Sequence, residues 1–554
     1  MKTQDLKQSV LKRWTDLKQE REPYVDQWLE ISRHITPASG RFLTSDKNKA
    51  RERWNRIYDN TATRAANILT AGLMSGMTDP ASQWFALTTG DPDLDSSQAV
   101  KVWLDQTQRI MEMAFSRTNT YQALQHCWRE VGVYGVTAMV IIEDPEMGFC
   151  CFPLVAGEYC IGVNWKGEPD TLYRKFTMTV AQLVKRYGYS KLSRTAKQLY
   201  DDKAYDKRLR CIHAIEPRLE RDNRKQDNLN MPWRSVVILL ESDEDEGILE
   251  ESGYNEFPAI VGRWGASASD VYSEECPGMV AIGDVKQLQH EQLQKGNAID
   301  YQVDPPKILP TSAADKPLDF LPGGISFFDM PGQNKQVQSA FNVNLNLAYL
   351  TQDIKEVQQR IREAFSVDMF LMLSGSAGQM TATEVAERHE EKLMMLGPVL
   401  SRLNHEVLRP LIERTFAILQ RAGQIPPPPP ELRGQSLSIE YTSMLARSQR
   451  AIRANSLSNF LGVVANVAQF KPEVLHKVNG FNVLNEMADY YSVAPSVLVP
   501  DDEANQALQQ QQQAQQQAMQ QEQSINALSA LGKVPSGDET MAGKAIQGLQ
   551  GIAQ

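Results

Sequence analysis

Two long helical patterns enclose a short β-containing insert near the middle of the chain. The first runs from Gly278 to Gln302, and the second from about Asn344 to Leu373. Between them, Asp304-Pro305-Pro306 breaks the first helix, and the pieces 307–309 and 324–328 have the composition of strands. Both helices carry charges of both signs on much of their surface, so we expect their seams to be buried only between subunits of an assembly.

A loop of small residues follows the second helix. Thr381 and Glu384 then have the spacing of a capping box, which predicts that a new helix begins there. This helix extends to Gln424, and Gly397-Pro398 within it predicts a kink, because proline removes one backbone hydrogen bond and clashes with the preceding turn. The loop consists of Ser374, Gly375, Ser376, Ala377, Gly378, Gln379 and Met380.

The first half of the chain alternates helical and strand patterns, which predicts an α+β fold class. An amphipathic helical pattern covers residues 3–35, where Pro23 is expected to divide it in two, and a helix rich in small residues covers 61–77. Further helices are expected at 97–115, 121–134 and 180–187, hairpins at 136–156 and 158–180, and strands at 84–87, 209–218 and 233–241.

The last part of the chain begins with a stiff polyproline spacer, 426–430. An SH3-type ligand is the functional alternative for this stretch. Residues 437–444 read as a strand that returns to the sheet of the body, and two helices follow at 445–468 and 474–491. Beyond residue 501 the chain is rich in glutamine, which is compatible with disorder, with a loose helix or with single ordered helices.

Composition indicates a globular protein made in a reducing compartment. Of its 554 residues, 42% are hydrophobic and 23% charged. No apolar run reaches the ~18 residues that a membrane span needs, and the N-terminus has no apolar segment typical of a secretory signal. The six cysteines lack the spacing of a zinc site, so we expect reduced and mostly buried thiols.

The net charge of −10 limits what the chain does with nucleic acid. A protein that grips DNA is usually basic, because neutralising phosphates releases counterions. An acidic surface argues against a tight DNA binder. It is compatible with a conduit that repels the polyanion and touches it only through a few basic residues.

Patterns associated with catalysis are incomplete. Gly537 to Lys544 resembles a phosphate loop with one residue too many, and Ala545 stands where a magnesium-binding hydroxyl is required. The segment 389–393 begins like a zinc-binding HExxH helix, but Leu393 replaces the second histidine. Asp300 and Asp304 are explained more simply by a helix end than by a metal site. We therefore expect no catalytic centre, no metal and no cofactor.

The order helix, β insert, helix, small-residue loop and kinked helix resembles the portal (head-to-tail connector) proteins of short-tailed bacteriophages. The segments that carry the resemblance are 381–385 and 396–403, together with Tyr58–Thr61 and Ala71–Gly76 near the N-terminus. The likeness extends to about residue 500 and rests on the order and spacing of these segments.

The resemblance implies a division of the chain into the parts of a portal subunit. These parts are the wing (1–277), the first stem helix (278–302), the clip (303–341), the second stem helix (342–373), the tunnel loop (374–383), the long kinked helix (384–424), the polyproline spacer and return strand (425–444), the helical crown (445–500) and the Gln-rich tail (501–554).

The resemblance also implies a function. Such subunits form a ring, a dodecamer in the family, at one capsid vertex of the virion, assembled in the host cytoplasm, through which double-stranded DNA is packaged and ejected. Implied partners are other copies of the chain, the terminase large subunit, a tail adaptor, the major capsid protein, and scaffolding or internal core proteins; no membrane is involved.

Three groups of residues are candidates for this function. We expect Lys286, Lys295 or Lys355 to line the channel, although an ion pair with a neighbouring carboxylate is the simpler role for each. The tunnel loop is uncharged, so its contact with DNA would be steric, and a plain connecting loop is its alternative role. The clip is expected to dock the adaptor through Pro305, Pro306, Phe320, Phe327 and Phe328.

Two other functions compete with a portal. A DNA-processing enzyme or packaging motor subunit would need the phosphate loop or clustered acids that the sequence lacks. A tail adaptor would be shorter than this chain, by analogy with such proteins.

Overall fold

A computed structural model describes the chain from Thr3 to Leu531, apart from several internal segments. Its mixture of helices and sheets confirms the α+β class. The chain forms two compact units: a body unit (1–88, 106–427 and 437–448) and a C-terminal unit (89–105, 428–436 and 449–554). The segments outside the description are 38, 41–56, 92–93, 95–96, 226, 243–246, 268–269, 310–320, 322, 328–337, 340–346, 374–395, 433–437, 442–443, 492, 494–496 and 500.

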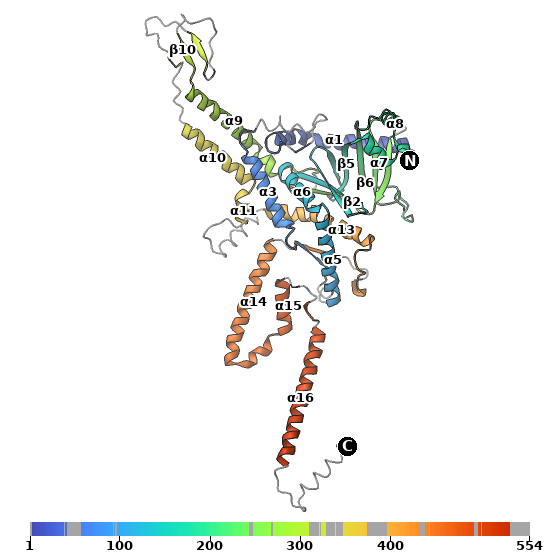
Figure 1. The fold of residues 1–554 in the computed structure, drawn as a ribbon, viewed down its shortest axis with the longest axis vertical. Helices are drawn as coiled ribbons and strands as arrows, with labels where there is room; N and C mark the ends of the chain where they lie inside the picture. The colour runs from blue at the N-terminus through green and yellow to red at the C-terminus, as the bar shows by residue number, and fades with distance from the viewer. Residues whose placement is uncertain are drawn as a thin grey trace, which may run out of the picture. The chain divides into compact units, whose positions relative to one another are not determined.

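The largest sheet of the body unit has five antiparallel strands in the order β4-β5-β6-β7-β8 and is covered on both faces (Figure 1). Residues of β7 alternate between the two sides: Val236 and Ile238 pack with α1, whereas Val237 and Leu239 pack with α7 and α8. The strands are β4 (Tyr159–Val163), β5 (Pro169–Thr179), β6 (Arg208–Pro217), β7 (Trp233–Leu239) and β8 (Ile248–Tyr254), and the helices are α1 (Thr3–His34), α7 (Val180–Tyr187) and α8 (Arg194–Asp201).

A second sheet of three strands, in the order β3-β2-β9, packs against helix α6. The hairpins expected at 136–156 and 158–180 are therefore both present, as β2–β3 and β4–β5. Strand β8 and helix α8 were not expected from the sequence. The second sheet consists of β2 (Val136–Asp144), β3 (Gly148–Leu154) and β9 (Ala259–Arg263), and α6 spans Thr120–Tyr134.

Two expectations for the body need correction. Helix α1 runs through Pro23 without dividing, because the chain buries Leu17 before the proline and Trp28 and Ile31 after it. Packing on both sides outweighs the loss of one helical hydrogen bond. Strand β13 (Ser438–Tyr441) does return to the body, but it pairs only with β1 (Phe85–Thr88), in a two-stranded sheet of its own.

The long helix near residue 400 changes its winding at a proline. Residues 396–403 are α-helical, η3 (Asn404–Leu408) is a π-helical turn, and α13 (Arg409–Arg421) follows. Pro410 lies at the start of α13, where its ring cannot be accommodated beside the carbonyl four residues before it, and the wider turn relieves that clash. The kink expected at Gly397-Pro398 lies at the edge of the described residues, because the preceding residues, 374–395, are not described.

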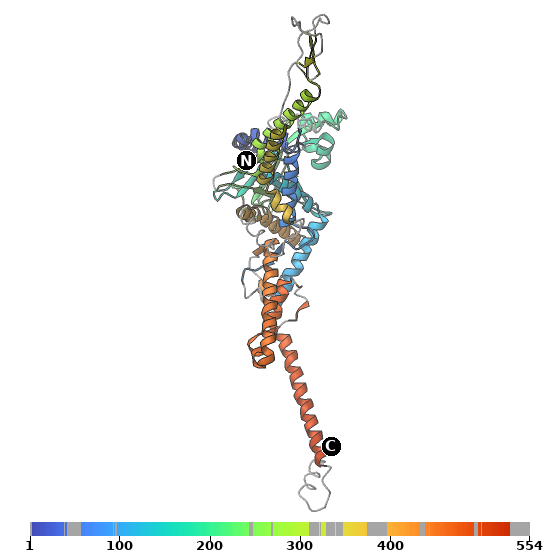
Figure 2. The ribbon, with the colours of Figure 1, turned by 90° about the vertical axis from the view of Figure 1, so that its left-hand side faces the viewer.

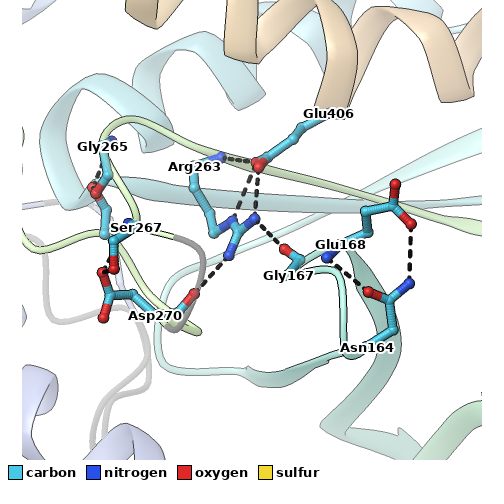
Figure 3. Close-up of polar contacts among 9 residues, drawn as sticks. Asn164, Gly167, Glu168, Arg263, Gly265, Ser267, Asp270 and Glu406 are labelled. Atoms are coloured by element: carbon cyan, nitrogen blue, oxygen red, sulfur yellow. Dashed lines mark hydrogen bonds and ion pairs between the residues drawn. The ribbon is translucent and has the colours of Figure 1, made fainter.

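A buried ion pair fastens this helix to the rest of the body (Figure 3). Arg263 at the end of β9 and Glu406 in η3 have side chains that are only 4% and 9% exposed, and Arg263 Nη2 lies 2.6 Å from Glu406 Oε1. The guanidinium also donates to the carbonyl oxygens of Asp270 and Gly167, each at 2.7 Å. One arginine thus joins η3, β9 and the turn between β4 and β5.

The C-terminal unit is helical. The helix expected at 474–491 begins later, at Gly480, because a 3-10 turn precedes it. Residues 501–531 of the Gln-rich tail form a helix, as one of the sequence alternatives proposed. The described elements are α14 (Met444–Phe470), which starts in the body unit, η5 (Pro472–Lys477), α15 (Gly480–Tyr490) and α16 (Asp501–Leu531), with η4 (Pro430–Leu432) and the start of α5 (Gln98–Arg117).

We predict that Arg263→Ala lowers the free energy of unfolding by about 3–5 kcal/mol, because it leaves the buried Glu406 carboxylate without its partner. Arg409→Ala is the matched control on the same helix: its pair with Glu413 is exposed, so the loss should stay below ~1 kcal/mol. Chemical denaturation of the two variants tests this, and equal losses would contradict the assignment.

Candidate functional site: the helix pair and its anchor

Helices α9 (Pro277–Val303) and α10 (Leu347–Ala364) lie side by side and pack against each other (Figure 1, Figure 2). Buried apolar residues recur at helical spacing on both, for example Val285 and Leu288 on α9 and Ile354 and Val357 on α10. The expectation that these seams are buried only between subunits is therefore wrong for the part near the body. The apolar stripe on each of the two helices is narrow, and the charged residues on the other faces make it hard to recognise in the sequence.

The outer half of α9 is different. After Glu291, every side chain described on this helix is half-buried or exposed. Leu293, Ile299 and Val303 are exposed there, and so is Tyr349 near the start of α10. Within the described chain this outer half thus carries apolar surface that the single subunit does not cover.

The β insert between the two helices is present as expected. Strand β10 (Lys307–Leu309) pairs in parallel with β11 (Ile325–Phe327) and antiparallel with β12 (Gln338–Ser339). Asp304, the residue that ends α9, accepts a backbone hydrogen bond from Gly323 at 2.8 Å and forms an ion pair with Lys307 at 3.0 Å. These contacts support the helix-end role of Asp304 over a role in metal binding.

Asp59 joins the helix pair to the body. Its Oδ2 accepts hydrogen bonds from Gln292 Nε2 on α9 at 3.0 Å and from Gln358 Nε2 on α10 at 2.8 Å. Its Oδ1 accepts from the backbone N–H of Thr61, at the start of α3 (Thr61–Met77), at 2.8 Å. The side-chain amide of Gln289 on α9 also pairs with the backbone of Asp59. Its Oε1 accepts a hydrogen bond from Asp59 N–H at 3.0 Å, and its Nε2 donates one to Asp59 O at 2.8 Å. One carboxylate therefore ties three helices together.

The pKa of Asp59 lies below its ordinary value. Partial burial raises it, but the hydrogen bonds donated by Thr61, Gln358 and Gln292 together lower it by more, because they stabilise the charged form. The carboxylate is therefore ionised at neutral pH. Asp59 belongs to Tyr58–Thr61, one of the segments in which the sequence resembles portal proteins.

Helix α11 (Val367–Leu373) packs against α3 at the position of Gly72. A Cβ placed on Gly72 would lie 2.0 Å from Cδ1 of Phe370, so only glycine lets the ring approach. Between α10 and α11, Ser366 has a φ of 52°, a left-handed conformation that a non-glycine residue adopts at a cost of about 1–3 kcal/mol. The segment Ala71–Gly76, which is one of those that resemble portal proteins, thus packs against α11, the helix that follows α10.

The three candidate lysines occupy different environments. Lys286 forms an ion pair with Glu30 of α1 at 3.0 Å, and the hydrogen bond it donates lowers the pKa of that glutamate. Lys295 is half-buried and Lys355 exposed, and neither pairs with a carboxylate among the residues that the structure describes. A role in the channel stays a prediction for all three, and Lys286 has the simpler structural role as well.

Several predicted site residues lie outside the described part of the chain. They include the whole tunnel loop, from Ser374 to Met380, the capping residues Thr381 and Glu384, and the incomplete motifs at 389–393 and 537–545. In the clip, Pro305 is half-buried and Pro306 buried, while Phe320, Phe328 and the side chain of Phe327 are not described.

Groups with strongly shifted pKa values are buried among structural contacts. Burial raises the pKa of Glu130 on α6 to about 7, while its two oxygens accept hydrogen bonds from Ser39 Oγ at 2.6 Å and Ala156 N at 2.8 Å. Burial likewise raises the pKa of the Cys127 and Cys276 thiols to about 12, far from reactive thiolates. Among the described residues, no His, Cys, Asp and Glu side chains cluster as metal ligands do, and no helix could cross a membrane.

We predict that Asp59→Ala lowers the free energy of unfolding at pH 7 by about 2 kcal/mol, because Gln292, Gln358 and the Thr61 amide lose a charged acceptor. Since the pKa of Asp59 is lowered in the fold, this contribution is present above the ordinary value of 3.8 and is lost as pH falls through the lower folded value.

Denaturation at pH 7 and near pH 3 measures both effects. The difference between the original chain and Asp59→Ala should shrink at the lower pH. Asp353→Ala, which removes an exposed carboxylate from the same helix pair, is the control and should change little at either pH. A difference that stays constant with pH would contradict the role given to the ionised carboxylate.

Comparisons with known proteins identify the family. The family described as "Bacteriophage head to tail connecting protein" matches residues 7–498. A "Probable portal protein" of Bordetella phage BPP-1 is 46% identical over 504 residues, which cover 91% of this chain and 90% of the relative. The "Portal protein" of Salmonella phage epsilon15 is 39% identical over 498 residues, covering 90% and 89%. The chain therefore belongs to the bacteriophage head-to-tail connecting proteins, a family of structural connectors rather than enzymes.

Proposed function

We propose that this chain is the subunit of a portal ring at one vertex of a phage capsid, through which double-stranded DNA enters and leaves the head. The observation that carries the proposal is the anchored helix pair: two antiparallel helices with a β insert at one end and Asp59 and Gly72 fixing the other. The family resemblance implies two stem helices that flank a small clip, and this helix pair with its insert supports that assignment. Portal-type relatives that match over about nine-tenths of the chain support it.

In this proposal α9 and α10 are the stem, the insert 303–341 is the clip and residues 1–277 are the wing. The uncovered apolar residues of the outer stem, Leu293, Ile299, Val303 and Tyr349, support contacts with neighbouring copies in the ring. The subunit number, a dodecamer by family likeness, belongs to the same proposal. So do the roles of α14, α15 and η5 as the crown.

The proposal assigns a partner to each part of the subunit. We propose that the clip docks the tail adaptor, through Pro305, Phe320, Phe327 and Phe328, after the terminase large subunit has left. Pro306, expected in the same surface, is buried and is therefore left out of it. Capsid, scaffolding and internal core proteins would meet the outer surface of the ring. The virion is then the site of action, with assembly in the host cytoplasm.

The acidic composition suits a channel that DNA must slide through. With 68 acidic against 58 basic residues, the chain does not offer the excess of cations that phosphate binding needs. Lys295 and Lys355, which pair with no described carboxylate, are the better candidates for isolated contacts with the DNA backbone. In a ring, one such lysine becomes a belt of positive charge.

Assembly tests the proposed function directly. The purified chain should form large rings with a central opening in negative-stain images, without DNA or nucleotide, because subunit contacts alone cover the outer stem. A single monomeric species at micromolar concentration in physiological salt would overturn the proposal. A compact monomer that hydrolyses ATP would favour a packaging motor instead.

The tunnel loop gives a second test. Because Ser374 to Met380 holds two glycines and no charge, we predict that it acts as a steric valve that retains packaged DNA without driving it. Deletion of Gly375–Gly378 should leave the amount of packaged DNA unchanged and cause filled heads to leak. Packaging and nuclease-protected DNA over time measure the two steps separately. Normal filling with normal retention would leave the segment as a plain connection between helices.

A further inference from the structure

Helix α14 in the C-terminal unit has a surface without charge. Between Arg453 and Lys471 the sequence contains no Asp, Glu, Lys or Arg. In a chain of which 23% is charged, about every fourth residue would be expected to carry a charge. Charge depletion of this kind is typical of the centre of a protein–protein interface.

Four apolar residues form a stripe along this helix. Phe460, Val463, Val467 and Phe470 follow one another at intervals of three, four and three residues, which places them on one face. They are 54%, 59%, 44% and 91% exposed. The two phenylalanines alone leave roughly 300 Å² of apolar surface in water, if a phenylalanine buries about 200 Å² when covered.

The chain covers a different face of the same helix. Ala454 and Val464 are buried, at 2% and 8% exposure, and lie to one side of the stripe around the helix axis. The stripe is therefore not the side on which α14 contacts its own unit. It is an additional apolar face.

Helix α15 offers a second apolar patch. Leu484 lies on α15, and Tyr491 is the first residue after the helix, where its backbone N–H still donates to Met487 O at 3.0 Å. The two residues are seven positions apart and therefore lie near one face, and they are 56% and 62% exposed. A ring in which each subunit contacts the next through one surface and the previous through another needs two different patches on every copy. The stripe on α14 and the patch on α15 meet that need.

The occupant that fits best is a second copy of this chain. Copies that each carry a net charge of −10 repel one another, and a surface without carboxylates lets them meet without adding to that repulsion. The segment 454–470 provides such a surface. Aromatic side chains without charged neighbours are also typical of the core of a subunit interface.

We propose that the stripe of α14 in one subunit packs against the patch of Leu484 and Tyr491 in the next, and that this seam closes the C-terminal unit of the ring. The inference rests on the proposed ring. It adds which surfaces meet and in which sense: α14 to α15, rather than α14 to α14. A stripe that paired with itself would make a two-fold dimer and would not continue around a ring.

Site-directed cross-linking tests the seam in the full chain. Val463→Cys and Leu484→Cys subunits are produced separately and then coassembled, so that any 463–484 link joins two copies. A short bismaleimide is the probe. The native cysteines give little background, because five are buried and Cys150 is half-buried. The expected result is a linked dimer in the mixture and none with either variant alone.

Ser458→Cys is the matched control. Ser458 is exposed on α14 and lies nine residues, or about two and a half turns, from Val467, hence on the opposite side of the helix. Mixed with Leu484→Cys, it should give no link. Links with Val463→Cys alone, or links as strong from Ser458→Cys, would overturn the proposal.

Ring stability supplies an independent readout. Val463→Glu and Leu484→Glu should each raise the concentration needed for half-assembly by roughly tenfold or more, because each buries a charge in the seam. Ser458→Glu should leave it unchanged. Rings that form normally with Val463→Glu and show no 463–484 link would remove the seam while leaving the portal function intact. Failure of the unaltered chain to form rings would instead remove the proposed function.

Discussion

The carboxylate of Asp59 fixes how the helix pair leaves the body. Three donors from three helices converge on its two oxygens, from Gln292, Gln358 and the amide of Thr61. Hydrogen bonds to a charged acceptor are stronger than those between neutral groups, so each of these three contacts holds its helix more firmly than a neutral hydrogen bond would.

Other contacts near Asp59 also hold these helices in place. Phe370 of α11 packs against Gly72 of α3, and Arg360 of α10 forms an ion pair with Asp284 of α9 at 3.0 Å. The helices are thus held at the end near the body and left uncovered at the outer end. Such a division suits a subunit that must keep its own shape before assembly and offer apolar surface to its neighbours during it.

A second buried contact holds the helix that contains η3 and α13 against the body. Arg263 and Glu406 are buried together, and the arginine's remaining donors satisfy carbonyl oxygens of Gly167 and Asp270. A buried pair with every polar group satisfied adds less to stability than its short distances suggest, but it defines one geometry sharply. Since Pro410 forces a π turn beside it, the pair also fixes where the helix departs from regular winding. In the sequence, residues 374–395 thus connect two segments, α11 and the helix from 396, that each pack against the body.

Local periodicity and turn chemistry determined much of this protein from sequence alone. The helix at 61–77, the hairpins that became β2–β3 and β4–β5, and the insert strands β10 and β11 follow from patterns within short stretches. The third insert strand, β12, was not expected. The family followed from their order. Tertiary structure decided the rest, because it depends on partners far apart in the chain. Packing on both sides keeps α1 whole at Pro23, and β13 finds β1 across more than 300 residues. In the sequence, Gln292 and Gln358 look like ordinary polar residues of two helices. Only the fold places the Asp59 carboxylate between them. A narrow apolar stripe on α9 and α10 is recognisable as a seam only when the two helices are seen together.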